Sequence, residues 1–219
     1  MSEAQKTQAA KKPEPKKPGR SLIYGIAKPI AALLFKTFLP VKYHNRERIN
    51  IEPPFIAIGN HYSMMDPVIM GVAVKKHQVR FIGKKELWTH KLVAAIFDNM
   101  NMIPVDRHNS DREAMRACMR VTREGGILGI FPEGTRHHEG LMTEMESGIG
   151  LIALRSRVPL IPVYIAGKVG LFRRLHVYVG EEIPTEDLRE QGVNRETCEL
   201  LMKRITQTYA AMNEAHTKA

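Results

Sequence analysis

The chain has 219 residues, of which 43% are hydrophobic, and its 33 lysine and arginine residues against 23 aspartate and glutamate residues give a net charge of +10. This composition suits one globular domain, and the sequence has no repeat with a period of about 20 to 50 residues, so fibrous, solenoid and wholly disordered proteins are excluded. The two cysteines, Cys118 and Cys198, lie far apart and form no CxxC pair. This excludes a disulfide framework and a structural zinc site, and it favours a reducing compartment.

The first 20 residues are predicted to form a disordered basic tail. They contain six basic and two acidic residues together with three prolines. Such a segment has too little apolar surface to offset the entropy lost on ordering. The rest of the chain still carries a net charge of +6. Nucleic acid, an anionic membrane surface and acidic metabolites are all compatible with this charge.

The next segment, residues 21–42, is predicted to associate with a membrane. Nearly every residue from 22 to 39 is apolar or small, but the stretch also contains Lys28, Pro29 and Lys36. It is therefore too short and too interrupted to span a bilayer. We expect a helix pair in the membrane interface, with the lysines reaching toward lipid headgroups. The alternative is a helix that covers a soluble core; a secretory signal is disfavoured because no small-residue cleavage site follows.

Residues 43–219 are predicted to form an α/β domain, because strand-like and helix-like stretches alternate along them. Helix N-caps are expected at Ser110, in a capping box of sequence SDRE, and at Asn194, and the first of these helices should end at Gly125-Gly126. We expect a mostly parallel central sheet flanked by helices, with ligands at the carboxyl ends of the strands. The expected strands are 55–58, 79–82, 102–105, 127–131, 160–165 and 175–179.

His61 and Asp66 follow the first of these strands, in the sequence NHYSMMDP. On a straight helix, a spacing of five residues places two side chains about 140° apart, so this pair meets only if the chain turns between them. In that case the carboxylate fixes the tautomer of the imidazole and leaves its second nitrogen as a general base. Taken alone, the spacing favours a simpler interpretation, in which Asp66 caps a helix and His61 is an ordinary polar residue.

Three further blocks follow or form predicted strands. Arg107 follows strand 102–105, and its guanidinium suits a phosphate or an ion pair with Asp106. The sequence PEGTR at 132–136 combines a carboxylate, a flexible glycine, a hydroxyl and a guanidinium, which suits a phosphate with neighbouring hydroxyl groups. The sequence VPLIPV at 158–163 is apolar, and its two prolines predict an edge strand or an irregular start.

Together these blocks resemble the glycerolipid acyltransferase family, in particular the bacterial lysophosphatidate (1-acylglycerol-3-phosphate) acyltransferases. The similarity lies in their order and approximate spacing and covers about residues 41–185. It implies the α/β fold of the glycerol-3-phosphate acyltransferases for residues 43–219. The motifs that carry it are NH-x4-D at 60–66, IPVDR at 103–107, FPEGTR at 131–136 and VPLIPV at 158–163.

The resemblance implies a reaction in phospholipid biosynthesis. His61, held by Asp66, would deprotonate the 2-hydroxyl of lysophosphatidate, which would attack the thioester of acyl-CoA or acyl carrier protein to give phosphatidic acid. It also implies a protein bound peripherally or monotopically to membrane lipids on the cytoplasmic face of the cell membrane. Neither a metal, nor another cofactor, nor nucleic acid is expected. The glycerol phosphate head would be bound by Arg107, Glu133, Gly134, Thr135 and Arg136.

One departure from the family pattern leaves alternatives open. Many members have phenylalanine and lysine where this sequence has Met145-Glu146, and a glutamate reverses a charge near an anionic substrate. Another lyso-lipid or an aminolipid is therefore the alternative acceptor. Two other classes are a non-enzymatic basic protein, although no nucleic-acid-binding motif is present, and a lipid hydrolase with Ser63 as nucleophile, although Ser63 lacks a G-x-S-x-G setting.

Overall fold

A computed structural model describes most of the chain outside its first 20 residues. The basic tail, the predicted cap at Ser110 and three of the predicted phosphate ligands, Arg107, Thr135 and Arg136, lie outside the described residues. The described ranges are 21–106, 112–134, 141–142, 144–146, 148–168 and 170–217.

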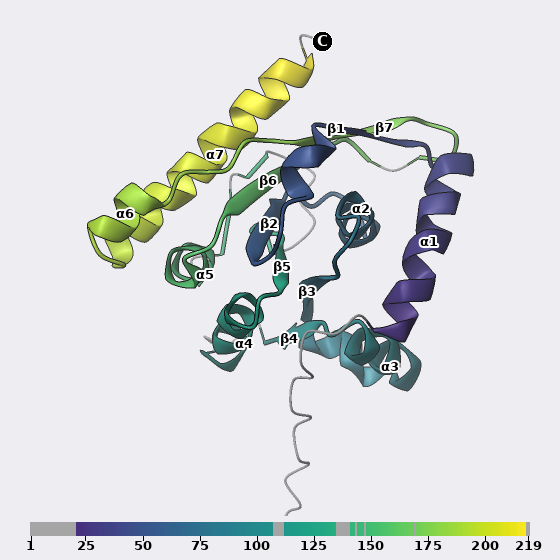
Figure 1. Ribbon diagram of the computed structural model, residues 1–219, viewed down its shortest axis with the longest axis horizontal. Helices are drawn as coiled ribbons and strands as arrows, with labels where there is room; N and C mark the ends of the chain where they lie inside the picture. The colour runs from purple at the N-terminus through teal and green to yellow at the C-terminus, as the bar shows by residue number, and fades with distance from the viewer. Residues whose placement is uncertain are drawn as a thin grey trace, which may run out of the picture.

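A seven-stranded sheet forms the centre of the protein, with the strands in the order β1-β7-β6-β2-β5-β3-β4 (Figure 1). All adjacent strands are parallel except β6 and β7. The expectation of a mostly parallel sheet is therefore confirmed. The strands are β1 (Val41–His44), β2 (Phe55–Gly59), β3 (Val79–Lys84), β4 (Ile103–Val105), β5 (Ile127–Ile130), β6 (Leu160–Ala166) and β7 (Leu175–Val179).

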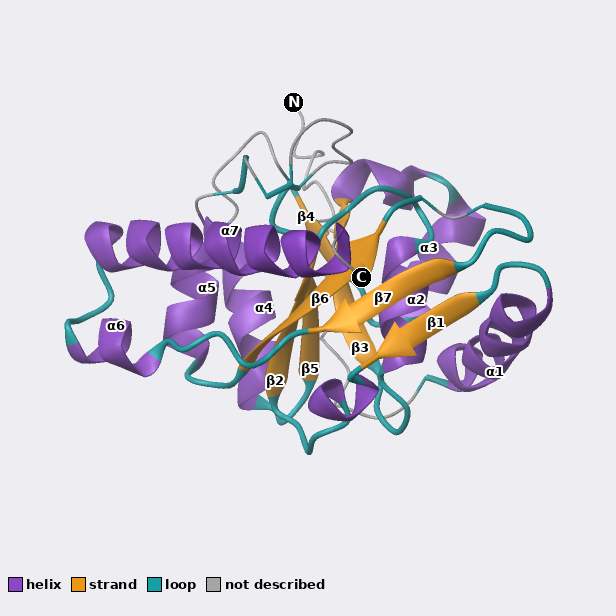
Figure 2. Ribbon diagram, turned by 90° about the horizontal axis from the view of Figure 1, so that it is seen from above, coloured by secondary structure: helices purple, strands orange, loops and turns teal. Residues whose placement is uncertain are grey.

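Helices cover both faces of the sheet (Figures 1 and 2). On one face α4, α5 and α7 bury Cys118, Ile152 and Leu201. On the other face α1 and α2 bury Phe35 and Ile69. The central strands are apolar on both sides for this reason. The helices are α1 (Leu22–Thr37), α2 (Asp66–Ala73), α3 (Lys91–Asn99), α4 (Arg112–Arg123), α5 (Gly148–Ser156), α6 (Glu186–Glu190) and α7 (Arg195–Thr217), with short 3-10 helices η1 (Arg46–Ile49) and η2 (Lys85–Thr89).

The expected ends of two helices are present. Asn194 Oδ1 accepts a hydrogen bond from the backbone N–H of Thr197 at 3.0 Å, so Asn194 caps α7 as predicted. After α4, Gly125 has a φ of +77°, and the N–H of Gly126 donates to the carbonyl of Val121 at 2.8 Å. This left-handed glycine ends the helix where the sequence predicted.

A single helix, α1, occupies the segment in which we expected a helix pair, and it continues through Pro29 without a break. The buried side chains of Tyr24 and Phe35 lie on either side of Pro29 and pack both halves of the helix onto the domain. These contacts compensate for the hydrogen bond that proline removes. Among the described residues, no helix combines the length and the apolar character that crossing a bilayer requires.

Two strands differ from the sequence prediction. β1 was not expected. It is a four-residue edge strand that pairs only with β7, and its apolar pattern is too short to predict a strand from the sequence. The edge-strand expectation for β6 is wrong, because β6 lies between β7 and β2. Pro159 precedes the strand. The part of β6 that pairs with β7 begins at Val163, so Pro162 lies one residue before it. The missing N–H groups therefore interrupt little of the ladder.

Candidate functional site

The predicted site residues that the structure describes meet at the carboxyl ends of β2 and β5. These two strands are neighbours and run parallel. Asn60 and His61 directly follow β2, and Phe131 and Glu133 follow β5. The two loops therefore lie at one edge of the sheet, where open α/β folds place their ligands.

His61 and Asp66 are in direct contact. The imidazole Nδ1 of His61 lies 2.9 Å from Oδ2 of Asp66. The chain turns between them, and Asp66 begins α2 with Pro67 in the first turn. The side chain of His61 is 18% exposed, whereas that of Asp66 is 1% exposed. The predicted meeting of the two side chains is therefore present, and their catalytic role stays a prediction.

Three donors besides His61 hold the buried carboxylate of Asp66. The backbone N–H groups of Tyr62 and Ser63 each donate to Oδ2 at 2.6 Å, and the Ser63 hydroxyl donates to Oδ1 at 2.9 Å. The carboxylate is the acceptor in each of these bonds, and its Oδ2 is also placed to accept the Nδ1 proton of His61. Nε2 of His61 then keeps its lone pair and can act as a base.

Ser63 is part of this turn. Its hydroxyl donates to Asp66 and accepts a hydrogen bond from the backbone N–H of Met65 at 3.1 Å. A nucleophilic serine needs a base that removes its proton, whereas the partner here is a buried carboxylate that orients the histidine. The hydrogen bonding therefore favours a structural role for Ser63 and speaks against the hydrolase alternative.

Aromatic rings fix the orientation of the His61 imidazole. The ring of His61 stacks on Phe131, with 4.6 Å between the centroids and an interplanar angle of 27°. Phe131 in turn stacks on Phe81 at 5.9 Å. A Cβ at Gly59 would lie 3.1 Å from the Phe131 ring and 2.4 Å from Cε of Met70, so a larger residue at the end of β2 would require these side chains to shift.

Glu133 connects two loops at the site. Its Oε2 accepts the backbone N–H of His61 at 2.8 Å, and its Oε1 accepts the backbone N–H of Met142 at 3.0 Å. The residue is buried. In the structure Glu133 therefore positions the backbone of His61 through an interaction that the sequence did not reveal, and its predicted contact with the substrate stays a prediction.

Gly134 and Glu146 lie together next to this connection. Gly134 has a φ of +66°, and a Cβ at this position would lie 2.7 Å from Oε1 of Glu146. Only glycine meets both the backbone and the space requirement. The carboxylate of Glu146, at the position where the sequence departs from the family pattern, is thus placed beside the loop that follows β5.

Tyr62 adds a neutral hydroxyl near the pair. Burial, followed by the negative charge of Glu133, raises the pKa of Tyr62, while a hydrogen bond with Asn60 lowers it. The net shift is upward, so the hydroxyl stays protonated at neutral pH.

Asn60 holds the end of β2 to β6, a role that the sequence did not reveal. Its side chain is fully buried. Nδ2 donates to the carbonyl of Ile165 at 3.0 Å, and Oδ1 accepts the N–H of Ile165 at 2.8 Å. The side-chain amide thereby extends the pairing of the two strands next to His61. A polar residue directly after a buried apolar strand was the only sequence signal for it.

Replacement of Asn60 by alanine is expected to lower the free energy of unfolding by about 3 kcal/mol, because it leaves the buried N–H and C=O of Ile165 without partners. Urea unfolding followed by circular dichroism measures this. Asn99→Ala, at an exposed asparagine whose side-chain amide donates to the carbonyl of Ala95, is the matched control and should change stability by less than about 0.5 kcal/mol. Equal unfolding midpoints for both variants would contradict the role assigned to Asn60.

The far end of α2, whose first residue is Asp66, is held by side chains from three other elements. The Lys28 ammonium of α1 donates to the carbonyls of Val74, Lys75 and His77, the last two at 3.0 and 3.3 Å. Cations suit this position because the C-terminus of a helix carries partial negative charge. The expectation that Lys28 reaches lipid headgroups is therefore wrong. The other donors are Arg46 and Asn50, both to Ala73, and Tyr43, to Ile69.

The described residues contain no cluster of three histidine, cysteine, aspartate or glutamate side chains that could hold a metal ion. The adjacent His137 and His138 lie outside the described residues.

Comparisons with known proteins point to a family of enzymes. A model of the acyltransferase family matches residues 40–166. The 1-acyl-sn-glycerol-3-phosphate acyltransferase of Bacillus subtilis is 28% identical over 152 residues, which cover 67% of this chain and 75% of that protein. Its counterpart in Streptococcus pneumoniae is 30% identical over 179 residues, which cover 78% of this chain and 66% of that protein.

A solved structure has the same fold. The crystal structure of the 1-acyl-sn-glycerophosphate (LPA) acyltransferase PlsC from Thermotoga maritima matches with a TM-score of 0.58 at 22% identity. The match covers 84% of this chain and 77% of that chain. It confirms the expected fold class.

Proposed function

Because the chain belongs to the acyltransferase family, we propose that it transfers a fatty acyl group from acyl-CoA or acyl carrier protein to the 2-hydroxyl of 1-acylglycerol-3-phosphate. The product is phosphatidic acid. The observation that carries this proposal is the contact between His61 Nδ1 and the buried Asp66 carboxylate at the edge of the sheet. Relatives that are named for this reaction support the choice of acceptor.

In the proposed mechanism, Nε2 of His61 removes the proton of the acceptor hydroxyl as the oxygen attacks the thioester carbonyl. The tetrahedral intermediate then expels the thiolate, which takes the proton from the imidazolium. Asp66 stabilises the imidazolium between these two steps. The acceptor hydroxyl takes the part of the serine in a catalytic triad, so no acyl-enzyme forms. General-base catalysis of this kind contributes about 10²–10⁴ to the rate.

The phosphate of the acceptor is proposed to bind between the loops that follow β4 and β5. Arg107 directly follows Asp106 at the end of β4, and Thr135 and Arg136 directly follow Gly134. Two guanidinium groups and a hydroxyl match the oxygens of a phosphate monoester. Glu133 supports this arrangement by holding the loop to the backbone of His61.

α1 is proposed to lie in the interface on the cytoplasmic side of the cell membrane, where both candidate donors are available. Its outer side presents exposed apolar side chains at a spacing of three or four residues, while Tyr24 and Phe35 hold its inner side to the domain. Such a helix lies in the plane of the membrane, and the basic tail before it adds attraction to anionic lipid. This arrangement brings the site to an acceptor whose acyl chain stays in the bilayer. The exposed residues, here called the α1 stripe, are Leu22, Ile26, Ile30 and Leu33.

A second acceptor class is favoured by one observation. The carboxylate of Glu146 lies beside Gly134, next to the proposed phosphate site. A negative charge at this place repels a phosphate monoester dianion and attracts the amine of a zwitterionic or amino lipid. The second candidate function is therefore acyl transfer to a lyso-lipid with a cationic group in its head.

A panel of acceptors decides between the two functions. The purified full chain is incubated with radiolabelled acyl-CoA, or with labelled acyl carrier protein, and with lysophosphatidate, lysophosphatidylethanolamine, lysophosphatidylcholine or an aminolipid. We expect lysophosphatidate to be acylated with the highest kcat/KM. Acylation of an amine-bearing lipid while lysophosphatidate stays unchanged would replace the first function by the second, and no transfer to any acceptor would contradict both.

A further inference from the structure

The turn between β6 and β7 exposes two large apolar side chains at its tip. Gly170 and Arg173 form an isolated antiparallel bridge, and Leu171 and Phe172 lie between them, 67% and 69% exposed. Phe172 has a φ of +57°, a left-handed conformation that glycine or asparagine adopts more readily than an aromatic residue. Neither the burial nor the backbone conformation of this turn requires a phenylalanine at position 172. The exposed pair is therefore a candidate for a binding surface.

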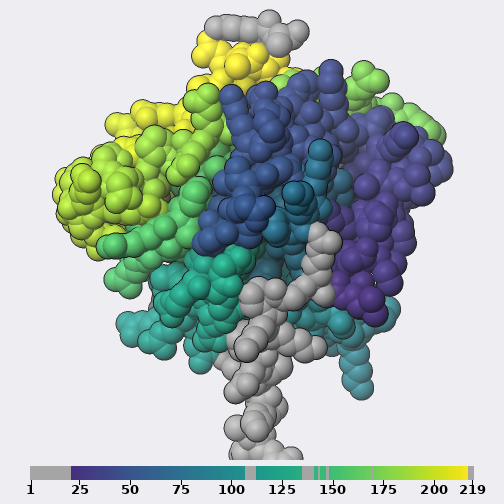
Figure 3. Space-filling view, in the orientation of Figure 1, coloured from purple at the N-terminus to yellow at the C-terminus, as the bar shows by residue number. Residues whose placement is uncertain are grey.

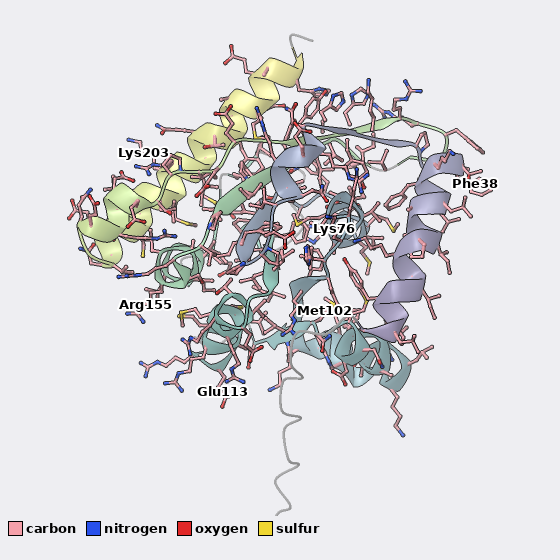
Figure 4. All side chains as sticks on the ribbon, viewed as in Figure 1. Phe38, Lys76, Met102, Glu113, Arg155 and Lys203 are labelled. Carbon is pink, nitrogen blue, oxygen red and sulfur yellow. The ribbon has the colours of Figure 1, made fainter. Side chains whose placement is uncertain are left out.

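This β6–β7 turn, residues 170–173, is continuous with the end of α1. The N–H of Phe172 donates to the carbonyl of Phe38 at 2.9 Å. The two phenylalanine rings lie 6.3 Å apart. Figure 4 places Phe38 at the outer edge of the molecule, on the side opposite Lys203. The β6–β7 turn therefore lies next to the C-terminal end of α1.

The other end of α1 is continued by a second exposed apolar surface. α3 packs against α1. It exposes Leu92 and Ile96. Figures 1 and 3 show α1 along one side of the molecule, with the segment before β7 near one end and α3 near the other. Three elements with exposed apolar residues, namely α1, α3 and the β6–β7 turn, are thus in contact with one another through α1.

Basic residues flank the tip of the turn in the sequence. Lys168, Arg173 and Arg174 are exposed. The sequence contains no aspartate or glutamate between Glu146 and Glu181. Exposed apolar residues with basic neighbours suit the interface of an anionic bilayer. There, cationic side chains contact the lipid phosphates and apolar side chains enter the acyl layer. A two-residue tip is also too small to form a stable protein dimer by itself.

We propose that the β6–β7 turn inserts Leu171 and Phe172 into an anionic bilayer, as a second membrane contact beside α1, with Arg173 and Arg174 at the lipid phosphates. The proposal rests on the proposed membrane-bound acceptor and adds the residues of attachment. Two contacts at the ends of one surface fix the tilt of the domain, whereas a single helix leaves rotation about its axis free. The orientation of the site toward the bilayer then depends on the turn.

Sedimentation with vesicles of phosphatidylcholine and phosphatidylglycerol tests the apolar part of the proposal. Phe172→Asn is expected to weaken binding about tenfold, and the double variant with Leu171→Ser about a hundredfold, because each loses most of the burial of one large side chain. Asparagine tolerates positive φ, so the thermal midpoint of Phe172→Asn should not fall. Leu200→Ser is the matched control and should bind as the unchanged chain does, because this exposed leucine lies on α7, which Figure 1 shows on the opposite side of the molecule from α1.

The charged part has its own test. Arg173→Gln with Arg174→Gln is expected to weaken binding to the anionic vesicles about tenfold or more, with little change for pure phosphatidylcholine vesicles. Unchanged vesicle binding by the Leu171 and Phe172 variants would overturn the proposal. Equal loss by Leu200→Ser, a lower thermal midpoint that accounts for the loss, or conversion of a dimer to a monomer without loss of vesicle binding would overturn it as well.

The vesicle assay requires no acyl transfer, so the two proposals fail separately. Loss of binding in the turn variants together with an inactive acceptor panel retains the membrane contact and rejects the proposed reaction. Acylation of lysophosphatidate together with unchanged binding of the turn variants retains the reaction and rejects the contact.

Discussion

Replacement of His61 by glutamine is expected to lower kcat for acyl transfer by about 10²–10⁴, because the variant has no group that takes the proton of the acceptor hydroxyl. The KM for the acceptor should change little, since the proposed phosphate ligands remain. The fold should also remain, because the backbone N–H bond from His61 to Glu133 does not depend on the side chain and Asp66 keeps its donors from Tyr62 and Ser63. Initial rates with labelled donor at saturating acceptor measure the effect.

The matched control for this variant is His90→Gln, at an exposed histidine just before α3. This variant should retain full activity in the same assay. A His61→Gln enzyme that keeps more than about a tenth of the rate would show that another group acts as the base, and would remove the observation on which the proposed function depends.

Replacement of Asp66 by asparagine is expected to lower both activity and stability. The carboxylate accepts hydrogen bonds from Tyr62, Ser63 and His61 inside the protein. Asparagine keeps the shape but removes the charge that stabilises the imidazolium, so we expect kcat to fall about 10²-fold or more. The loss of charge-assisted bonds should lower the free energy of unfolding by about 1–3 kcal/mol. Rates and urea unfolding of the same preparation separate the two effects.

Ser63→Ala is the matched control for Asp66→Asn. It removes the hydrogen bond to Oδ1 of Asp66 and the one from the N–H of Met65 but leaves the bond to His61, so it should cost about 1–2 kcal/mol of stability and keep most of the activity. An inactive Ser63→Ala enzyme would support the hydrolase-like nucleophile. Normal turnover in Asp66→Asn would contradict the orienting role of the carboxylate.

The strands were the most predictable part of the fold. β7 begins and ends at Leu175 and Val179 as predicted, and β2 extends only one residue further than predicted. Buried strands of an α/β sheet are short apolar runs between turn residues, which a sequence shows directly. Strand order is not a local property. The position of β6 inside the sheet therefore contradicted the edge-strand alternative that was drawn from Pro159 and Pro162.

The site was predictable in its residues and less so in its contacts. The sequence left open whether a turn brings His61 to Asp66, and the structure contains that turn. The bond that Glu133 accepts from the backbone N–H of His61 joins two loops that lie far apart in the chain. No spacing rule predicts such bonds, because they depend on which loops the sheet places together.

Through the ammonium group of Lys28, α1 stabilises α2, the short helix that carries Asp66. Its three carbonyl partners lie at and just beyond the end of α2, and Asp66 lies at the beginning of the same helix. Removal of residues 1–37, for example to improve solubility, would remove Lys28 and leave those carbonyls without their cation. Turnover would then suffer even with an acceptor dispersed in detergent, so lipid attachment and proton transfer share one structural support.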